Sequence, residues 1–298
     1  MKPQLLAEVA TLDAATVVRA RYAAAPSNWN AELDLWFAPA TGKTRLMRRR
    51  HLGPLVVQKP FHPEKDGTCH VYLLHPPGGI AGGDRLDMHF YLARNARALM
   101  TTPGATKFYR ADHGPSNQLT KIDVAEGAVC EYLPQETILF DGANAAIDTR
   151  VSLSGDATYV GWDIVCLGRP AADERFDNGQ LRQRIEITHD GRPVWFERIQ
   201  ISGDSPEMAA RHALAGHPTW GTMVYAGPLC EDAAVRVRAA IGTDGAGTFS
   251  VSQLERVVVC RYLGPRASAG KALFARAWSA LRVSCQGKAA SLPRIWAT

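Results

Sequence analysis

Short apolar runs separated by Gly, Pro, Asp and Asn are the feature that most limits how this chain can fold. The runs cover residues 32–37, 55–58, 69–74, 98–102, 128–133, 159–167, 181–188 and 194–201. Apolar runs of this length between turn-forming residues are typical of β-strands. The Asp190-Gly191 pair between the last two runs predicts a tight hairpin. We therefore expect a mainly β protein.

Helical patterns occur only late in the chain. Residues 232–241 favour a helix that ends at Gly242, and residues 268–282 carry apolar side chains at helical spacing, with Ser268 as a candidate N-cap. We find no fixed-period repeat in residues 29–298, whereas the Ala-rich residues 1–27 favour a loose N-terminal extension. The prediction is one large domain over residues 28–298, with many short strands in a β-helix-like or stacked-sheet arrangement and one or two C-terminal α-helices.

The composition supports a globular protein with a full core. Of 298 residues, 46% are hydrophobic and 21% are charged, and the formal net charge is +5. The one dense basic cluster contains Arg45, Arg48, Arg49 and Arg50. It lacks the aromatic residues or the helix motif of a nucleic-acid site, so we interpret it as a solvated hairpin edge. No nucleic-acid partner is expected.

The cysteines and the lack of long apolar stretches indicate the compartment. None of the six cysteines forms a C-x-x-C pair, and four lie inside apolar segments, as small buried side chains do. The N-terminal segment has no apolar signal core, and no stretch reaches the roughly 20 apolar residues of a membrane span. We expect a soluble, reduced, cytoplasmic protein with no membrane partner.

Acidic residues inside apolar strands are the anomaly that bears on function. Asp163, Glu197 and Glu131 each interrupt such a run. An isolated ionised carboxylate buried there would be costly. One interpretation pairs the acids with buried arginines such as Arg169 or Arg198. The other is a wet internal passage whose carboxylates bind a hydrated divalent cation weakly.

A Gly-rich loop follows the strand-like run that begins at His70. Two prolines and two Gly pairs lead directly to Asp84, which either caps the turn or is a rigidly held functional group. The neighbouring Thr106-Lys107 segment lacks the phosphate-loop spacing, and we find neither a zinc ligand set nor a G-x-S-x-G elbow. A hydrolase or transferase that uses Asp84 or Glu131 as general base is thus the weaker alternative, and we expect no enzyme.

Seven stretches, read in order, closely resemble the urease accessory protein D family, called H in some organisms. They are residues 53–64, 74–84, 102–110, 131–137, 142–145, 162–169 and 293–298. The resemblance extends over about residues 29–298, although residues 203–250 carry little of it.

The resemblance implies a scaffold for urease maturation rather than a catalyst. Members of this family dock on apo-urease and recruit a helical partner, accessory protein F, and through it a GTPase, accessory protein G. Nickel is delivered through this assembly. The family's fold is mainly β, with a β-helix-like stack and two helices, and an internal passage for nickel has been proposed in it.

The same resemblance implies residues for the passage. The expected stops for a transient Ni²⁺ ion are Asp84, Asp163 and Glu197, and the expected wall residues are Thr106 and Lys107. We add Glu131 to the wall because it is an acid inside an apolar strand, not because of the resemblance. No tightly bound cofactor is expected. A purely structural scaffold, with buried acids and no nickel transfer, is the remaining alternative.

The C-terminal region offers a candidate docking surface. It contains the aromatic and aliphatic residues Phe274, Trp278, Leu281 and Trp296, which could contact the helical partner. The alternative is that these side chains pack on the protein's own sheet.

Overall fold

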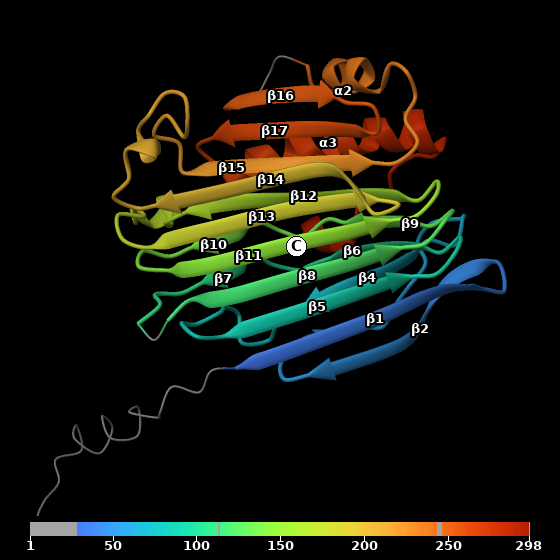
Figure 1. The fold of residues 1–298 in the computed structure, drawn as a ribbon, viewed down its shortest axis with the longest axis horizontal. Helices are drawn as coiled ribbons and strands as arrows, with labels where there is room; N and C mark the ends of the chain where they lie inside the picture. Colours follow the sequence, from blue (N-terminus) through green and yellow to red (C-terminus); the bar gives the residue numbers. More distant parts are fainter. Residues whose placement is uncertain (1–28, 113, 243–245, 298) are drawn as a thin grey trace, which may run out of the picture.

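Two β-sheets lie face to face in the computed structural model, and helices cover the outer side of one of them (Figure 1). The structure describes residues 29–112, 114–242 and 246–297. Within these residues the first sheet has seven strands in the order β14-β13-β11-β8-β5-β1-β2. They are β1 (Asn30–Ala40), β2 (Lys43–Leu52), β5 (Arg85–Leu92), β8 (Ser116–Val124), β11 (Asn144–Leu153), β13 (Gln180–His189) and β14 (Arg192–Ser202).

The second sheet follows the order β16-β17-β15-β12-β9-β6-β4-β3. Its strands are β3 (Val56–Val57), β4 (Cys69–Leu74), β6 (Arg97–Thr101), β9 (Val129–Tyr132), β12 (Thr158–Leu167), β15 (Thr219–Ala226), β16 (Thr248–Gln253) and β17 (Val257–Gly264). The short strands β7 (Thr106–Phe108) and β10 (Thr137–Leu139) pair with each other, and β10 also pairs with β12. The mainly β prediction is confirmed.

The chain between β4 and β13 winds as a coil that alternates between the two sheets. Because successive turns stack, β4, β6, β9 and β12 pair in parallel in one sheet, and β5, β8, β11 and β13 do so in the other. At one corner the Val129 N–H donates to the Ala96 carbonyl (2.8 Å), and the Thr158 N–H donates to the Ala128 carbonyl (2.9 Å). The predicted β-helix-like stack is therefore confirmed.

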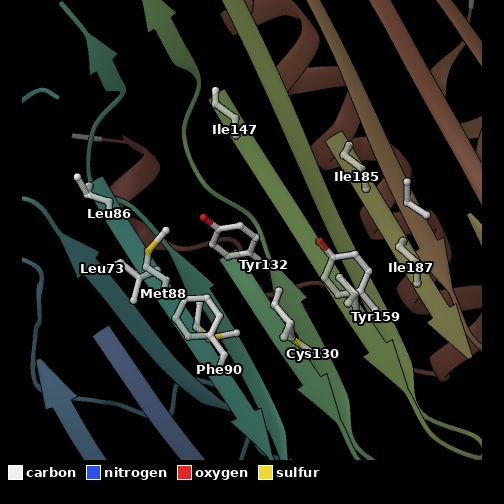
Figure 2. Close-up of a cluster of buried hydrophobic side chains, with 14 of the residues drawn as sticks. Leu73, Leu86, Met88, Phe90, Cys130, Tyr132, Ile147, Tyr159, Ile185 and Ile187 are labelled. Atoms are coloured by element: carbon white, nitrogen blue, oxygen red, sulfur yellow. The ribbon is translucent and has the colours of Figure 1, made fainter. Parts of the chain in front are cut away.

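The main apolar core lies between the sheets. Strands of the seven-stranded sheet alternate buried and accessible residues, as expected for a sheet with one solvated face. Strand β12 is buried along nearly its whole length because helices cover its other side. Figure 2 shows side chains of this core, among them Phe90, Tyr132 and Tyr159.

Helices α2 (Ala233–Ile241) and α3 (Ala267–Gln286) pack on the second sheet and form a second core with it. Gly242 ends α2 as predicted, whereas Ser268 is not the N-cap of α3, because the helix already begins at Ala267. Short 3-10 turns cover Pro170–Ala172, Pro206–Met208 and Arg294–Ala297. In the described part of the chain, no helix is both long and apolar enough for a membrane crossing.

Two further predictions concern the hairpin turn at Asp190 and the N-terminal segment. The β13–β14 hairpin turns at Asp190 and Gly191, whose φ values of 47° and 76° suit the tight turn that the sequence predicted. The expected loose extension over residues 1–27 lies outside the described residues.

Candidate functional site

A band of polar side chains crosses the apolar core between the sheets. Its members are Thr120, Tyr132, Tyr159, Asp163 and Gln183, and we refer to this set as the polar seam. Thr120 on β8 and Gln183 on β13 share the inward face with the apolar residues of their strands. The other three come from β9 and β12 of the facing sheet. The seam therefore joins both sheets.

Asp163 is the only charged member of the polar seam. Its neighbours on β12, Trp162 and Ile164, are 2% and 1% exposed and belong to the core under the helices. Asp163 points the other way, between the sheets, and keeps part of its surface accessible there. Burial, together with the nearby Glu197 charge, raises the pKa of Asp163 to about 6, although the Gln183 side chain opposes part of this rise.

The two tyrosines of the polar seam are neutral hydrogen-bonding groups. Burial, followed by the charge of Asp163, raises the pKa of both Tyr132 and Tyr159 above the usual value. Figure 2 shows the two rings on neighbouring strands among apolar side chains such as Phe90. Their hydroxyls thus add polarity to this part of the core without adding charge.

Two buried polar atoms of the polar seam have no hydrogen-bond partner among the described residues. They are Thr120 Oγ1 and Gln183 Oε1. An unpaired polar atom inside a protein costs free energy, so such atoms are few in native structures. Their presence in one zone between the sheets makes the polar seam suited to a polar species.

Glu197 on β14 lies beside the polar seam at the edge of the seven-stranded sheet. Thr222, the cross-strand neighbour of Asp163, donates its hydroxyl to Glu197 Oε1 (2.7 Å), and Arg261 Nη2 donates to Oε2 (2.7 Å). A cavity of about 440 Å³ opens here and is lined by Glu197, Arg261 and His212, among others. Glu197 is thus ion-paired, as the first interpretation of the acids expects, yet it borders an open space.

A second cavity, of about 290 Å³, lies near the Gly-rich loop. Thr106, Lys107, His75 and Tyr132 are among its lining residues. Tyr132 therefore borders this cavity and also belongs to the polar seam. The two predicted wall residues, Thr106 and Lys107, lie together at this end.

Asp84 acts as a cap of the Gly-rich loop. The Trp29 N–H donates to Asp84 Oδ1 and the Ala81 N–H donates to Oδ2, both at 2.9 Å. A Cβ at Gly79 would approach the Tyr109 ring to 2.2 Å, so a side chain at this position would displace that ring from the loop. Of the two roles that the sequence left open, these contacts match the turn-stabilising one.

The structure contradicts the prediction that Glu131 lines a wall shared with Asp163. Glu131 on β9 faces α3, on the opposite side of the sheet from the polar seam. Trp278 Nε1 and Arg282 Nε each donate to Glu131 Oε1 at 2.8 Å, and the residue is 1% exposed. Glu131 is buried, as its position in an apolar run predicts. It is paired with a buried arginine and does not line a wet passage.

The predicted docking residues on α3 also need correction. Phe274, Trp278 and Leu281 are fully buried against the second sheet, so they cannot form an exposed surface. Trp296 is partly buried: its Nε1 donates to Thr101 Oγ1 (2.9 Å), and its ring lies 5.5 Å from that of Trp162. These aromatic side chains hold α3 and the chain end on the sheet.

The sequence did not single out Thr120, Gln183 and Arg261, although they contact or surround the predicted acids. Polar residues at these positions carry no signal of their own, since Thr and Gln also occur on solvated strand faces. Only the strand register reveals which face they occupy. Over residues 29–112, 114–242 and 246–297, no three His, Cys, Asp or Glu side chains converge as a metal-binding group.

Comparison with known proteins gives one consistent family. The model of the UreD urease accessory protein family matches residues 30–297. "Urease accessory protein UreD 2" of Brucella anthropi is 60% identical over 272 residues, which cover 91% of this chain and 99% of the relative. "Urease accessory protein UreD" of Dechloromonas aromatica is 42% identical, with 91% of this chain and 95% of the relative covered. The protein of the same name from Azoarcus sp. is 40% identical, with 96% and 100% covered.

Proposed function

This chain belongs to the UreD family of urease accessory proteins, and from that premise we propose that it delivers nickel to apo-urease through the space between its sheets. Membership of the family implies a role in urease maturation. The proposal adds that the chain acts in the cytoplasm as a chaperone-like scaffold. It docks on apo-urease and binds accessory protein F, and through it the GTPase accessory protein G.

The position of Asp163 is the observation that carries the nickel proposal. It is a carboxylate between two sheets, with accessible surface, and no arginine or lysine of the described residues forms an ion pair with it. Oxygen ligands and water suit a hydrated divalent cation. A carboxyl with a pKa of about 6 is mostly ionised at neutral pH, so it can attract such a cation.

The proposed route joins the two cavities through the polar seam. A hydrated Ni²⁺ ion would pass the cavity beside Glu197, then Asp163 and the tyrosine hydroxyls, and then the cavity beside Thr106 and Lys107. Single carboxylates bind nickel weakly, and weak binding permits release to the next site, whereas a closed set of His or Cys ligands would hold the ion. Glu197 could serve as a stop only when its contact with Arg261 loosens.

The test replaces Asp163 by Asn in cells that also produce urease and its other accessory proteins. The substitution keeps the size of the side chain and removes its charge. We expect the variant to co-purify with the urease subunits as the parent does, while the nickel content of the urease falls. Asp123→Asn is the matched control, because Asp123 lies on β8 with half of its side chain exposed. Normal nickel content in Asp163→Asn would contradict the passage.

A purely structural scaffold is the second candidate, and two observations favour it. Both carboxylate oxygens of Asp84 accept backbone N–H groups, and Glu197 is held by Arg261 and Thr222. The same experiment separates the candidates. If Asp163→Asn fails to co-purify with urease, or co-purifies and loads it normally, Asp163 is structural and nickel travels elsewhere.

A further inference from the structure

A cluster of arginines lies on the outer face of the seven-stranded sheet, opposite to the polar seam. Arg184 on β13 and Arg198 on β14 stand directly across from each other, and Arg182 lies two residues along β13 (Figure 1 shows these adjacent strands). Like charges placed directly opposite in a sheet destabilise it. On its other side Arg184 faces Asp148 of β11, so the repulsion that remains uncompensated is the part that involves Arg198 and Arg182.

The three guanidinium groups border a cavity of about 380 Å³. Its other lining residues include Asn117, Asp148 and Gln200, so its wall is mainly polar. The amide group of Gln200 supplies further hydrogen-bond donors beside the arginines, whereas Asn117 Nδ2 already donates to the Pro115 carbonyl (3.2 Å). This is a set of donors around one space rather than a scatter of surface charges.

The charges around this cavity are only partly compensated. Arg184 pairs with Glu186, and Asp148 lies 3.5 Å from Arg150. In the part of the chain that the structure describes, Arg182 and Arg198 form no ion pair with any carboxylate. Two positive charges thus remain at the cavity, which matches the charge of a dianion.

The donors are also held in place. Arg184 Nε is buried and has no hydrogen-bond partner among the described atoms. Two guanidinium groups contact the half-exposed ring of Phe196, with Arg184 at 5.3 Å and Arg198 at 5.6 Å from its centroid. These cation–π contacts restrict both arginines before any ligand binds. Fixed guanidinium forks match the oxygens of a phosphate group.

We propose that Arg182, Arg184 and Arg198 form a binding site for a phosphate group on the outer face of this sheet. The cavity has room for a free phosphate ion and for a phosphate ester with a small substituent. Gln183 of the polar seam also lines the cavity, but the three arginines lie on the solvated side of the sheet, so the proposal does not rest on the nickel passage.

Calorimetric titration of the full chain with inorganic phosphate tests the site. We expect saturable binding, and Arg182→Gln combined with Arg198→Gln should weaken it by at least about tenfold, because two charge-assisted contacts are lost. Arg45→Gln combined with Arg49→Gln removes the same charge from exposed positions on β2 of the same sheet. This control should bind phosphate as the parent does.

Two further arms identify the ligand. Glycerol phosphate reports whether an ester is accepted: equal binding indicates a phosphate group on a larger molecule, and weaker binding indicates the free ion, both within the proposal. Acetate should bind far more weakly, since one carboxylate cannot engage three guanidinium groups. The proposal is overturned if phosphate binding does not saturate, if acetate matches phosphate, or if both double variants lose affinity equally.

Discussion

A buried acid has different surroundings on the two faces of the second sheet: on one face it has a cationic partner, and on the other it has none among the described residues. Glu131 on β9 and Asp163 on β12 both interrupt apolar runs, and their strands are hydrogen-bonded neighbours. Glu131 accepts hydrogen bonds from a guanidinium and an indole N–H under α3, whereas Asp163 lies beside the Gln183 amide and near the charge of Glu197. An acid in an apolar strand therefore marks a special environment, and the face that it occupies decides which kind.

The helix-covered face is a closed charge network. Arg282 bridges Glu131 and Glu64, and Lys288 contacts Glu64 and Asp66. Although burial acts in the opposite direction, hydrogen bonds from His70 and Arg282 lower the pKa of Glu64 to about 2. Each acid of this face has a cationic partner, and this ties α3 to the loop before β4.

The largest expected effect comes from removing the central cation of that network. Arg282→Met leaves Glu131 and Glu64 buried without their guanidinium, so the free energy of unfolding should fall by about 3–5 kcal/mol. Urea unfolding at neutral pH measures it. Arg236→Met, which removes an exposed partner of Asp232, should cost less than about 1 kcal/mol. If the free energy of unfolding fell by similar amounts in both variants, Arg282 would be no more important to stability than an exposed arginine, which would contradict a buried charge network.

Neutralising the two compared acids should change stability with opposite signs. The pKa of Asp163 in the folded protein, about 6, exceeds its value in the unfolded chain. Between about pH 4 and pH 6 the folded protein therefore keeps a proton that the unfolded chain has lost, and the free energy of unfolding falls as the pH rises over this range. Asp163→Asn should therefore raise the free energy of unfolding by about 2–3 kcal/mol near pH 8, and this gain should vanish near pH 4.

Glu131→Gln is the matched comparison for that experiment. It leaves Arg282 with one carboxylate fewer, so the free energy of unfolding should decrease by about 1–3 kcal/mol. Urea unfolding at several pH values measures both variants. A loss of stability in Asp163→Asn at high pH would show that Asp163 is paired like Glu131, and the contrast between the faces would disappear.

The smallest effect concerns the coupling between Asp163 and Glu197. Glu197→Gln removes a like charge, so the pKa of Asp163 should fall toward its ordinary value, while the lost contact with the exposed Arg261 should cost less than about 1 kcal/mol. Carbon-detected NMR titration of the Asp163 carboxyl measures the pKa. An unchanged pKa would mean that the two acids do not share one polar region.

The coil shows how a structural repeat can be absent from a sequence search. Ala96, Ala128 and Ala157 occupy equivalent, fully buried corners, but they are 32 and 29 residues apart. Loops of different length between strands remove any constant period. A sequence search for a small residue just before each apolar run, with variable spacing between the runs, could have found the coil.

The sequence by itself determined the strand-rich class, the late helices and the hairpin at Asp190. The signals for these features are the spacing of apolar residues, the turn-forming residues and the glycine that ends a helix, and each of them acts within a few residues of the chain. It also singled out Asp163, Glu197 and Glu131 as acids in apolar surroundings. Only the tertiary structure decided that Glu131 meets Arg282 while Asp163 enters the polar seam. The reason is that a strand presents alternate residues to opposite faces, and strands and helices distant in the chain decide what each face contacts.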